Sequence, residues 1–129
     1  MEPIILASSS PRRQEILKMM NIPFRVIMPN VNENLTTAKS PAELTETLAR
    51  SKVLSVVHSL PPKQVIPWVL GADTIVALNN RIYGKPSDQD EAFEYIKSFQ
   101  GKTHTVCTTS ALYNGAKKTT SVRTAISKV

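Results

Sequence analysis

With 129 residues, 41% of them hydrophobic and 20% charged, the chain is long enough to bury one core and is expected to form a single domain over residues 1–129. No apolar run approaches the length of a membrane span and no signal-peptide pattern opens the chain, which excludes a membrane protein and predicts a cytoplasmic one. The net charge is +6, of which +5 falls in residues 101–129, where no acidic residue occurs. This segment lacks the alternating aromatic residues typical of nucleic-acid surfaces, so a nucleic-acid partner is not favoured.

The N-terminal segment predicts a strand that leads directly into a helix. Residues 4–6 are apolar, and Ser10 followed by Pro11 is typical of a helix N-cap and a first helical position. The helix should continue to about residue 20, and the residues expected to be buried on it are Ile16, Leu17 and Met20. A second strand is expected over residues 24–28.

Basic and hydroxyl side chains surround the start of this helix. The first turn of a helix carries unpaired N–H groups and the positive end of the dipole, which favour an anion in front of it. Arg12 and Arg13 add positive charge there, and Ser8 adds a hydrogen-bond donor. One interpretation is a phosphate site. The alternative is a common helix start with solvated arginines, because the glycine-rich loop of the better-known phosphate motifs is missing.

The second helix has the clearest local signal in the chain. Ser40-Pro41-Ala42-Glu43 forms a capping box, and the helix should continue to about His58. The expected buried stripe of this helix consists of Leu44, Leu48, Ala49, Val53, Val56 and Val57. Lys52 lies near one edge of the stripe. A lysine at such a position more often keeps its ammonium group in solvent than serves a binding site. Glu33 lies in the polar loop before the helix and gains a role only if another carboxylate lies opposite it.

The most apolar region, residues 65–78, predicts a central strand in which pairing begins after Pro67. Asp73 is anomalous in this strand, because a buried carboxylate must be paired, hydrogen-bonded or bound to a metal. We therefore favour a functional role over a structural one for Asp73. Gly71, just upstream, would allow another backbone or a ligand to approach closely.

A hairpin and a third helix follow the central strand. Asn79-Asn80 should form the turn into a short strand over residues 81–83, and Gly84-Lys85-Pro86 is a short rigid loop that holds a lysine. Ser87 is expected to cap a helix that Gly101 closes. The residues of this helix expected to face the core are Ala92, Phe93, Ile96 and Phe99.

The C-terminal part predicts a long hairpin. Strands are expected over residues 103–113 and 119–126, joined at Asn114-Gly115, which favours a tight turn. The residues expected on one face of the returning strand are Val122, Thr124 and Ile126. Cys107 is the single cysteine and lies in a strand-like run, which is more typical of a core or surface thiol than of a nucleophile.

The predicted elements together indicate a mixed α/β domain with helices packed on a sheet. Its unusual features are a basic helix start, a loop glutamate, an aspartate in an apolar strand and two lysines on separate elements. Carboxylates suit a divalent cation, whereas basic side chains and helix N–H groups suit phosphate oxygens. The combination is typical of a site for metal-assisted phosphoryl transfer.

Several motifs, found in order from about residue 4 to the end of the chain, resemble the Maf family of nucleoside triphosphate pyrophosphatases. They are Leu6-Ala7-Ser8-Ser9-Ser10-Pro11-Arg12-Arg13-Gln14-Glu15-Ile16-Leu17, Asn32-Glu33, Lys52, Gly71-Ala72-Asp73-Thr74-Ile75-Val76, Gly84-Lys85-Pro86 and Gly101-Lys102-Thr103-His104-Thr105-Val106. The resemblance implies a Maf/ITPase-like α/β fold with a mixed sheet. It also implies hydrolysis of a nucleoside triphosphate to the monophosphate and pyrophosphate with a divalent cation, Mg²⁺ or Mn²⁺.

The resemblance further implies roles for single residues. Asp73 matches the family's proton acceptor, and Glu33 would help to hold the metal beside Asp73. The residues that would contact the phosphates are Ser8, Arg13, Lys52 and Lys85. Arg12 and Thr74 resemble the residues of the group that cleaves dTTP and UTP. Family members carry a further closing part with a glutamine used in base selection, so we expect a chain that is shortened at its C-terminus.

A non-catalytic protein is the alternative hypothesis from the sequence. Such a protein would hold nucleotides, or would bind a partner in cell division, as the family's association with septum formation suggests. A homodimer formed through an exposed sheet edge is a further expectation about partners.

Overall fold

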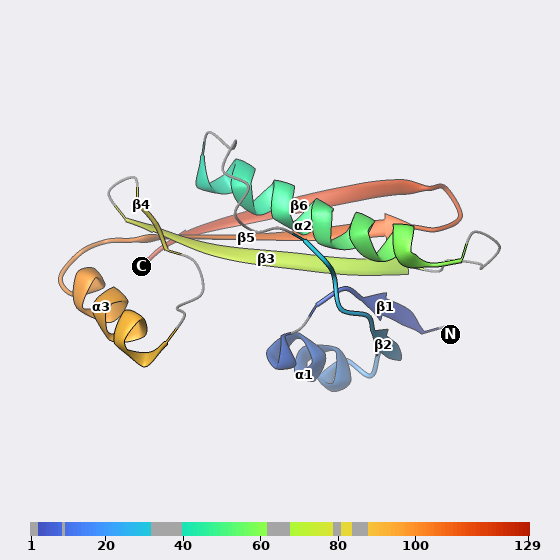
Figure 1. Ribbon diagram of the computed structural model, residues 1–129, viewed down its shortest axis with the longest axis horizontal. Helices are drawn as coiled ribbons and strands as arrows, with labels where there is room; N and C mark the ends of the chain where they lie inside the picture. The colour runs from blue at the N-terminus through green and yellow to red at the C-terminus, as the bar shows by residue number, and fades with distance from the viewer. Residues whose placement is uncertain (1–2, 9, 32–39, 62–67, 79–80, 84–87) are drawn as a thin grey trace.

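The structure, a computed structural model, describes residues 3–8, 10–31, 40–61, 68–78, 81–83 and 88–129. Within these residues it contains a mixed sheet and three helices (Figure 1). In chain order the elements are β1 (Ile4–Leu6), α1 (Pro11–Met19), β2 (Phe24–Val26), α2 (Pro41–Ser59), β3 (Trp68–Leu78), β4 (Arg81–Tyr83), α3 (Gln89–Phe99), β5 (Thr105–Asn114) and β6 (Thr119–Lys128). The predicted mixed α/β class is confirmed. None of the described helices combines the length and apolar character that a membrane crossing needs.

The edge of β3 that faces away from β5 is shared by two short strands. The sheet order is β2-β1-β3-β5-β6, and β4 also pairs with β3. β1 is parallel to β3 and reaches Val69 and Leu70, whereas β4 is antiparallel and pairs with residues 76–78. β5 pairs along nearly the whole other edge of β3. Residues 71–75 have no partner strand on the first edge among the described residues.

Local capping explains where the first two helices begin. The Ser10 Oγ atom accepts a hydrogen bond from the Arg13 backbone N–H at 3.4 Å, and the Ser40 Oγ atom accepts one from the Glu43 N–H at 3.1 Å. Both predicted N-caps are confirmed, with proline at the next position in each helix. Because a side-chain oxygen satisfies an otherwise unpaired N–H group, these helices have a defined start.

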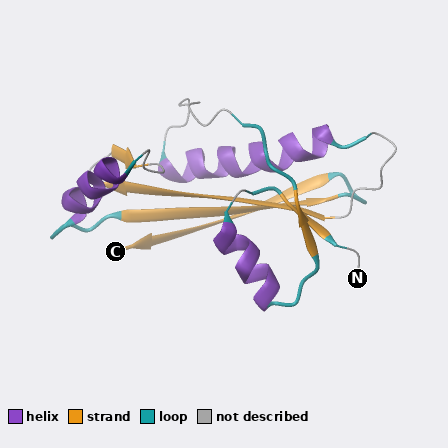
Figure 2. Cartoon of the chain, turned by 60° about the horizontal axis from the view of Figure 1, so that its bottom comes forward, coloured by secondary structure: helices purple, strands orange, loops and turns teal. Residues whose placement is uncertain are grey.

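α2 covers one face of the sheet and forms two core clusters with it, whereas α1 lies on the other side of the sheet (Figure 2). The first cluster contains Ile5, Ala7, Ala49, Val53, Val56, Val69, Ala111 and Tyr113. The second cluster contains Leu44, Leu48 and Ile75. Val69 and Ile75 therefore face α2 from the same side of β3. Asp73 is an even number of residues from both, so it faces α2 as well and lies between the two apolar clusters.

The predicted burial of α1 is wrong at two of three positions. Leu17 is 6% exposed, but Ile16 and Met20 are 45% and 61% exposed. The neighbouring strands β1 and β2 have three residues each, so they offer the helix only a narrow apolar surface. β2 also ends at Val26, before the predicted end of that strand.

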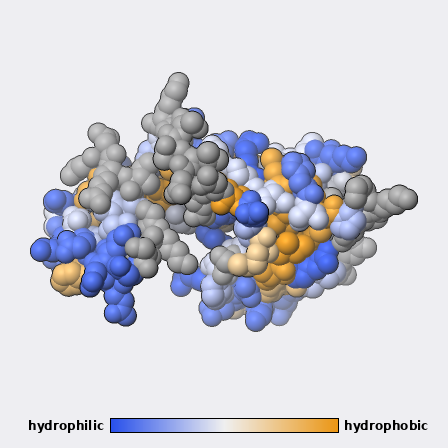
Figure 3. All heavy atoms as spheres, viewed as in Figure 1, coloured by the Kyte–Doolittle hydropathy of each residue, from blue (hydrophilic) through white to orange (hydrophobic). Residues whose placement is uncertain are grey.

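The predicted core face of α3 is wrong at Phe93 and Ile96, whereas Ala92 and Phe99 are partly buried. Phe93 and Ile96 are 65% and 61% exposed, and no residue of the helix is buried. α3 lies beside β4, away from α1 and α2 (Figure 1), and its Tyr95 and Phe99 rings contact Tyr83 edge to face at centroid distances of 4.9 Å. Figure 3 shows hydrophobic atoms at the surface over β1 and β2 and a smaller group on α3.

The helix start of α3 differs from the predicted one by one residue. Asp88 is the N-cap, and its Oδ1 atom accepts a hydrogen bond from the Glu91 N–H at 2.7 Å. Ser87, the predicted cap, lies outside the described residues. The predicted closing residue is confirmed, since Gly101 has a φ of 68°, a conformation that glycine adopts without strain.

Candidate functional site

The candidate site lies where β1 ends and β3 continues. Leu6 is paired with Leu70, and the Ala7 N–H donates to the Leu70 carbonyl at 2.8 Å. The chain then turns into α1, whereas β3 extends three residues further to Asp73, which corresponds to about 10 Å along the strand. The carboxyl end of a parallel strand and the N-terminus of the helix that follows it commonly form a ligand site. Asp73 therefore lies just beyond this end, in the stretch of β3 that has no partner on this edge among the described strands.

Ser8 and Arg13 are joined at the start of α1. Ser8 is 3% exposed, and its Oγ atom accepts hydrogen bonds from the Ser10 backbone N–H at 3.0 Å and from Arg13 Nη1 at 3.4 Å. Because the hydroxyl oxygen accepts both of these hydrogen bonds, its own hydrogen is left to donate to a ligand. The guanidinium group has other N–H donors as well. The predicted anion site thus has donors fixed in place by the fold.

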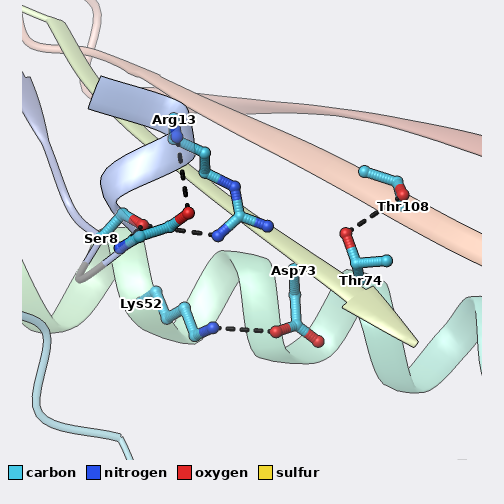
Figure 4. A network of polar contacts seen from close by, with 7 residues as sticks. Ser8, Arg13, Lys52, Asp73, Thr74 and Thr108 are labelled. Atoms are coloured by element: carbon cyan, nitrogen blue, oxygen red, sulfur yellow. Dashed lines mark hydrogen bonds and ion pairs between the residues drawn. The ribbon is translucent and has the colours of Figure 1, made fainter. Parts of the chain in front are cut away.

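Asp73 forms an ion pair with Lys52 of α2. The distance between Lys52 Nζ and Asp73 Oδ1 is 2.8 Å, and the two side chains are 14% and 12% exposed. Figure 4 shows this pair close to the pair formed by Ser8 and Arg13. The prediction that a carboxylate at this position needs a partner is confirmed, and the partner is Lys52. The commoner behaviour of a rim lysine, extension into solvent, does not occur here.

Gly71 brings α2 close enough for this ion pair. A Cβ atom at position 71 would lie 2.6 Å from Val53 Cγ2 and 3.4 Å from the Ala49 carbonyl oxygen. Normal carbon–carbon contacts lie at about 3.5–4.0 Å, so a larger residue here would force Val53 or the helix to shift. The prediction that Gly71 allows a close approach is confirmed, with α2 as the neighbour. Val53 directly follows Lys52, so this contact also fixes the height of Lys52 above the strand.

Thr74 projects from the other face of β3. It is exposed, and its Oγ1 atom lies 3.2 Å from Thr108 Oγ1 on β5. Successive strand residues point to opposite faces, and Figure 4 shows Thr74 turned toward Thr108 while Asp73 turns toward Lys52. Arg12 is exposed on α1, in contrast to the half-buried Arg13. The side chains of Thr74 and Arg12 are therefore both accessible to solvent, unlike the Lys52–Asp73 pair.

Sequence reasoning missed a buried hydroxyl opposite Asp73. Thr109 is paired in register with Asp73 on one side and Thr124 on the other, is 0% exposed, and lies 2.8 Å from Thr124 between the Oγ1 atoms. The other inward residues of β5 are Cys107, Ala111 and Tyr113. Thr109 shares the odd-numbered positions of these inward residues, so a hydroxyl within this set was the signal in the sequence. A row of polar residues, Asp73, Thr109 and Thr124, thus crosses the sheet from β3 to β6 at the level of the site.

Glu33 and Lys85, two of the predicted site residues, lie outside the described residues. Among the described residues, no group of three or more His, Cys, Asp and Glu side chains could hold a metal ion. Mg²⁺ commonly uses only one or two carboxylates and completes its shell with substrate phosphates and water. The Asp73 carboxylate, with its hard oxygen donors, fits a site of that kind.

Cys107 is not a candidate nucleophile in this fold. It is 2% exposed in β5, and burial raises the pKa of its thiol. A nucleophilic cysteine needs an accessible thiolate, which burial disfavours. The prediction of a core or surface thiol is confirmed in its core form.

Comparisons with known proteins agree with the arrangement of these elements. Residues 3–129 match the family model described as Maf-like protein. The chain is 42% identical to the dTTP/UTP pyrophosphatase of Pelotomaculum thermopropionicum over 92% of this chain and 60% of that protein. It is 46% identical to the dTTP/UTP pyrophosphatase of Symbiobacterium thermophilum over 89% of this chain and 57% of that protein. The chain therefore spans about three fifths of the length of these curated relatives.

A solved structure shows the same fold at low sequence identity. The Staphylococcus aureus Ham1 protein superposes with a TM-score of 0.63 at 16% identity, covering 98% of this chain and 70% of that one. At this identity the likeness concerns the fold alone. It extends over almost the whole chain, so the mixed sheet and its helices follow a known arrangement.

Proposed function

The chain belongs to the Maf-like protein family, and on that premise we propose that it hydrolyses a nucleoside triphosphate to the monophosphate and pyrophosphate, with dTTP and UTP as the expected substrates. The names of the relatives support this choice of reaction. The structural observation that carries it is the mostly buried Lys52–Asp73 ion pair beside the donor-rich start of α1. We also propose that residues 1–129 form a single domain and that the protein acts in the cytoplasm.

The phosphate chain would be held by donors from separate elements. Ser8, Arg13 and the positive end of the α1 dipole would bind one part of the triphosphate, and Lys52 and Lys85 would bind another. Phosphoryl transfer depends mainly on positioning and on charge stabilisation of phosphate oxygens. Basic groups that the fold fixes before the substrate arrives supply both effects.

Asp73 is the proposed general base. In this reaction a water oxygen bonds to the α-phosphorus, the bond from that phosphorus to the bridging oxygen breaks, and pyrophosphate leaves with the electron pair. A carboxylate in hydrogen-bond reach of the water accepts its proton as the new bond forms. The nearly dry surroundings of Asp73 and its fixed position between two core clusters support this role.

Asp73 and Glu33 are the proposed ligands of a divalent cation, Mg²⁺ or Mn²⁺. When bound, the cation supplies positive charge to the phosphate oxygens of the substrate. Hard oxygen ligands match the preference of both ions. Arg12 and Thr74 are the proposed contacts that select the pyrimidine base, and their exposure leaves both available to it.

We further propose a homodimer formed through the outer strand of the sheet. β6 is the last strand in the sheet order and has ten residues, most of them exposed. A long open edge presents unpaired backbone groups to a second strand. Sedimentation velocity over a range of concentrations measures this association, and a constant monomer mass would argue against it.

The reaction is tested by incubating the chain with Mg²⁺ or Mn²⁺ and a panel of nucleoside triphosphates, and measuring pyrophosphate. We expect release from dTTP and UTP above that from the purine nucleotides. Circular dichroism confirms that the sample is folded. Nucleotide binding by calorimetry without pyrophosphate release would instead indicate a protein that holds nucleotides and does not cleave them.

A further inference from the structure

Lys52 is bonded to one oxygen of the Asp73 carboxylate, the group that a divalent cation would use in the proposed function. Its Nζ atom lies 2.8 Å from Asp73 Oδ1, within hydrogen-bond distance, and both side chains are mostly buried. In the proposed function the same carboxylate is a ligand of the cation. The ammonium group and the cation are therefore competitors for one carboxylate.

The surroundings make this competition strong. The pair lies between two apolar clusters that α2 forms with β3, where little water is present to screen charge. A divalent cation held by Asp73 would place a second positive charge beside the Lys52 ammonium group. A cation that arrives alone must displace the Lys52 ammonium group, whose positive charge already compensates the charge of Asp73.

A triphosphate changes this balance because it brings its own negative charge. Figure 4 shows Ser8 and Arg13 near the ion pair, and the Arg13 guanidinium group has N–H donors besides the one bonded to Ser8. Phosphate oxygens bound there would offer Lys52 new anionic partners, and a lysine ammonium group on its flexible stem can move between partners. Once Lys52 turns to the phosphates, the Asp73 oxygen is available to the cation.

We propose that Lys52 keeps the divalent cation away from Asp73 until a triphosphate binds, so that the cation enters with the nucleotide and not before it. This inference rests on the proposed function and adds the order of binding to it. Lys52 is thus both a phosphate contact and the group that prevents binding of the metal alone.

The test measures Mn²⁺ binding by calorimetry or by electron paramagnetic resonance in the absence of nucleotide. We expect the Lys52→Met variant to bind Mn²⁺ at least tenfold more tightly than the wild-type chain. The double variant Lys52→Met/Asp73→Asn should lose this gain. Arg50→Met is the matched control, because Arg50 is a cation on the same helix that is 45% exposed and paired with Glu46; its Mn²⁺ affinity should stay within twofold of wild type.

Equal Mn²⁺ affinity in the wild-type chain and Lys52→Met, or an equal gain in Arg50→Met, would overturn the inference. If Lys52→Met does not fold, the inference is tested on the wild-type chain alone, by its Mn²⁺ affinity with and without a bound nucleotide analogue. An analogue of dUTP with an imido group between the α- and β-phosphates should raise its Mn²⁺ affinity at least tenfold, and an unchanged affinity with the analogue bound would contradict the proposal. Analogue-dependent Mn²⁺ binding without pyrophosphate release from dTTP or UTP would count against hydrolysis while supporting exclusion by Lys52.

Discussion

Replacing Gly71 by alanine tests whether the close approach of α2 to β3 is a packing requirement. The added Cβ atom would lie 2.6 Å from Val53 Cγ2, whereas normal contacts lie at about 3.5–4.0 Å, so the helix and strand must separate by about 1 Å. Overpacking of this kind costs about 1–3 kcal/mol. Alanine regains about 0.5–1 kcal/mol because it restricts the unfolded chain. We expect the free energy of unfolding to fall by about 1–2 kcal/mol.

The assay is urea unfolding followed by circular dichroism, carried out as a double-mutant cycle with Val53→Ala. Val53→Ala removes the methyl group that the new Cβ atom would meet, so Gly71→Ala should cost less than about 0.5 kcal/mol in that background. Gly101→Ala is the control. Gly101 has no heavy atom within 4 Å of its built Cβ position but has a φ of 68°, so alanine there should cost about 1–2 kcal/mol without coupling to Val53. An equal cost of Gly71→Ala in both backgrounds would refute the packing account.

The ion pair and the buried thiol give two further predictions. Lys52→Met should lower the free energy of unfolding by about 3 kcal/mol because it leaves a mostly buried carboxylate unpaired, and the double variant Lys52→Met/Asp73→Asn should recover most of that loss in urea unfolding; equal stability of the single and double variants would contradict this. Because burial raises the pKa of Cys107 above its ordinary value of 9.0, the folded chain keeps the thiol proton at a pH where the unfolded chain loses it. The contribution of Cys107 to stability is therefore complete below the pKa of the unfolded thiol and is lost as the pH rises through the folded pKa. Unfolding curves compared with those of Cys107→Ala between pH 7 and 11 measure this decline, and parallel pH dependences of the two proteins would exclude it.

The features that the sequence predicted well depend on residues that are close together along the chain. Ser10 and Ser40 cap their helices through backbone groups three residues away, so the residue types alone identify the helix starts. Gly101 closes α3 by its own backbone conformation. The need of Asp73 for a partner was also predictable, since it follows from the cost of burying a charge in an apolar strand.

The features that the sequence did not predict depend on how distant segments pack. Lys52 lies 21 residues before Asp73, and no local pattern indicates that α2 would place the two side chains together. The amphipathic pattern of α3 is real, but Phe93 remains exposed because the helix lies beside β4 and not over the sheet. Thr109 could not be predicted from the sequence, because hydroxyl residues are common in strands and only the strand register shows that this one is paired with Asp73.

Pyrophosphate release by Asp73→Asn, compared with the wild-type chain on dTTP and UTP, tests most directly whether Asp73 is the centre of a hydrolytic site. The substitution keeps the size of the side chain and removes its ability to accept a proton, so we expect the rate to fall by about 10²–10⁴-fold. Asp90→Asn, at an exposed aspartate in the first turn of α3, is the matched control and should leave the rate unchanged. A folded Asp73→Asn variant with the wild-type rate would contradict the assignment of Asp73 as the base.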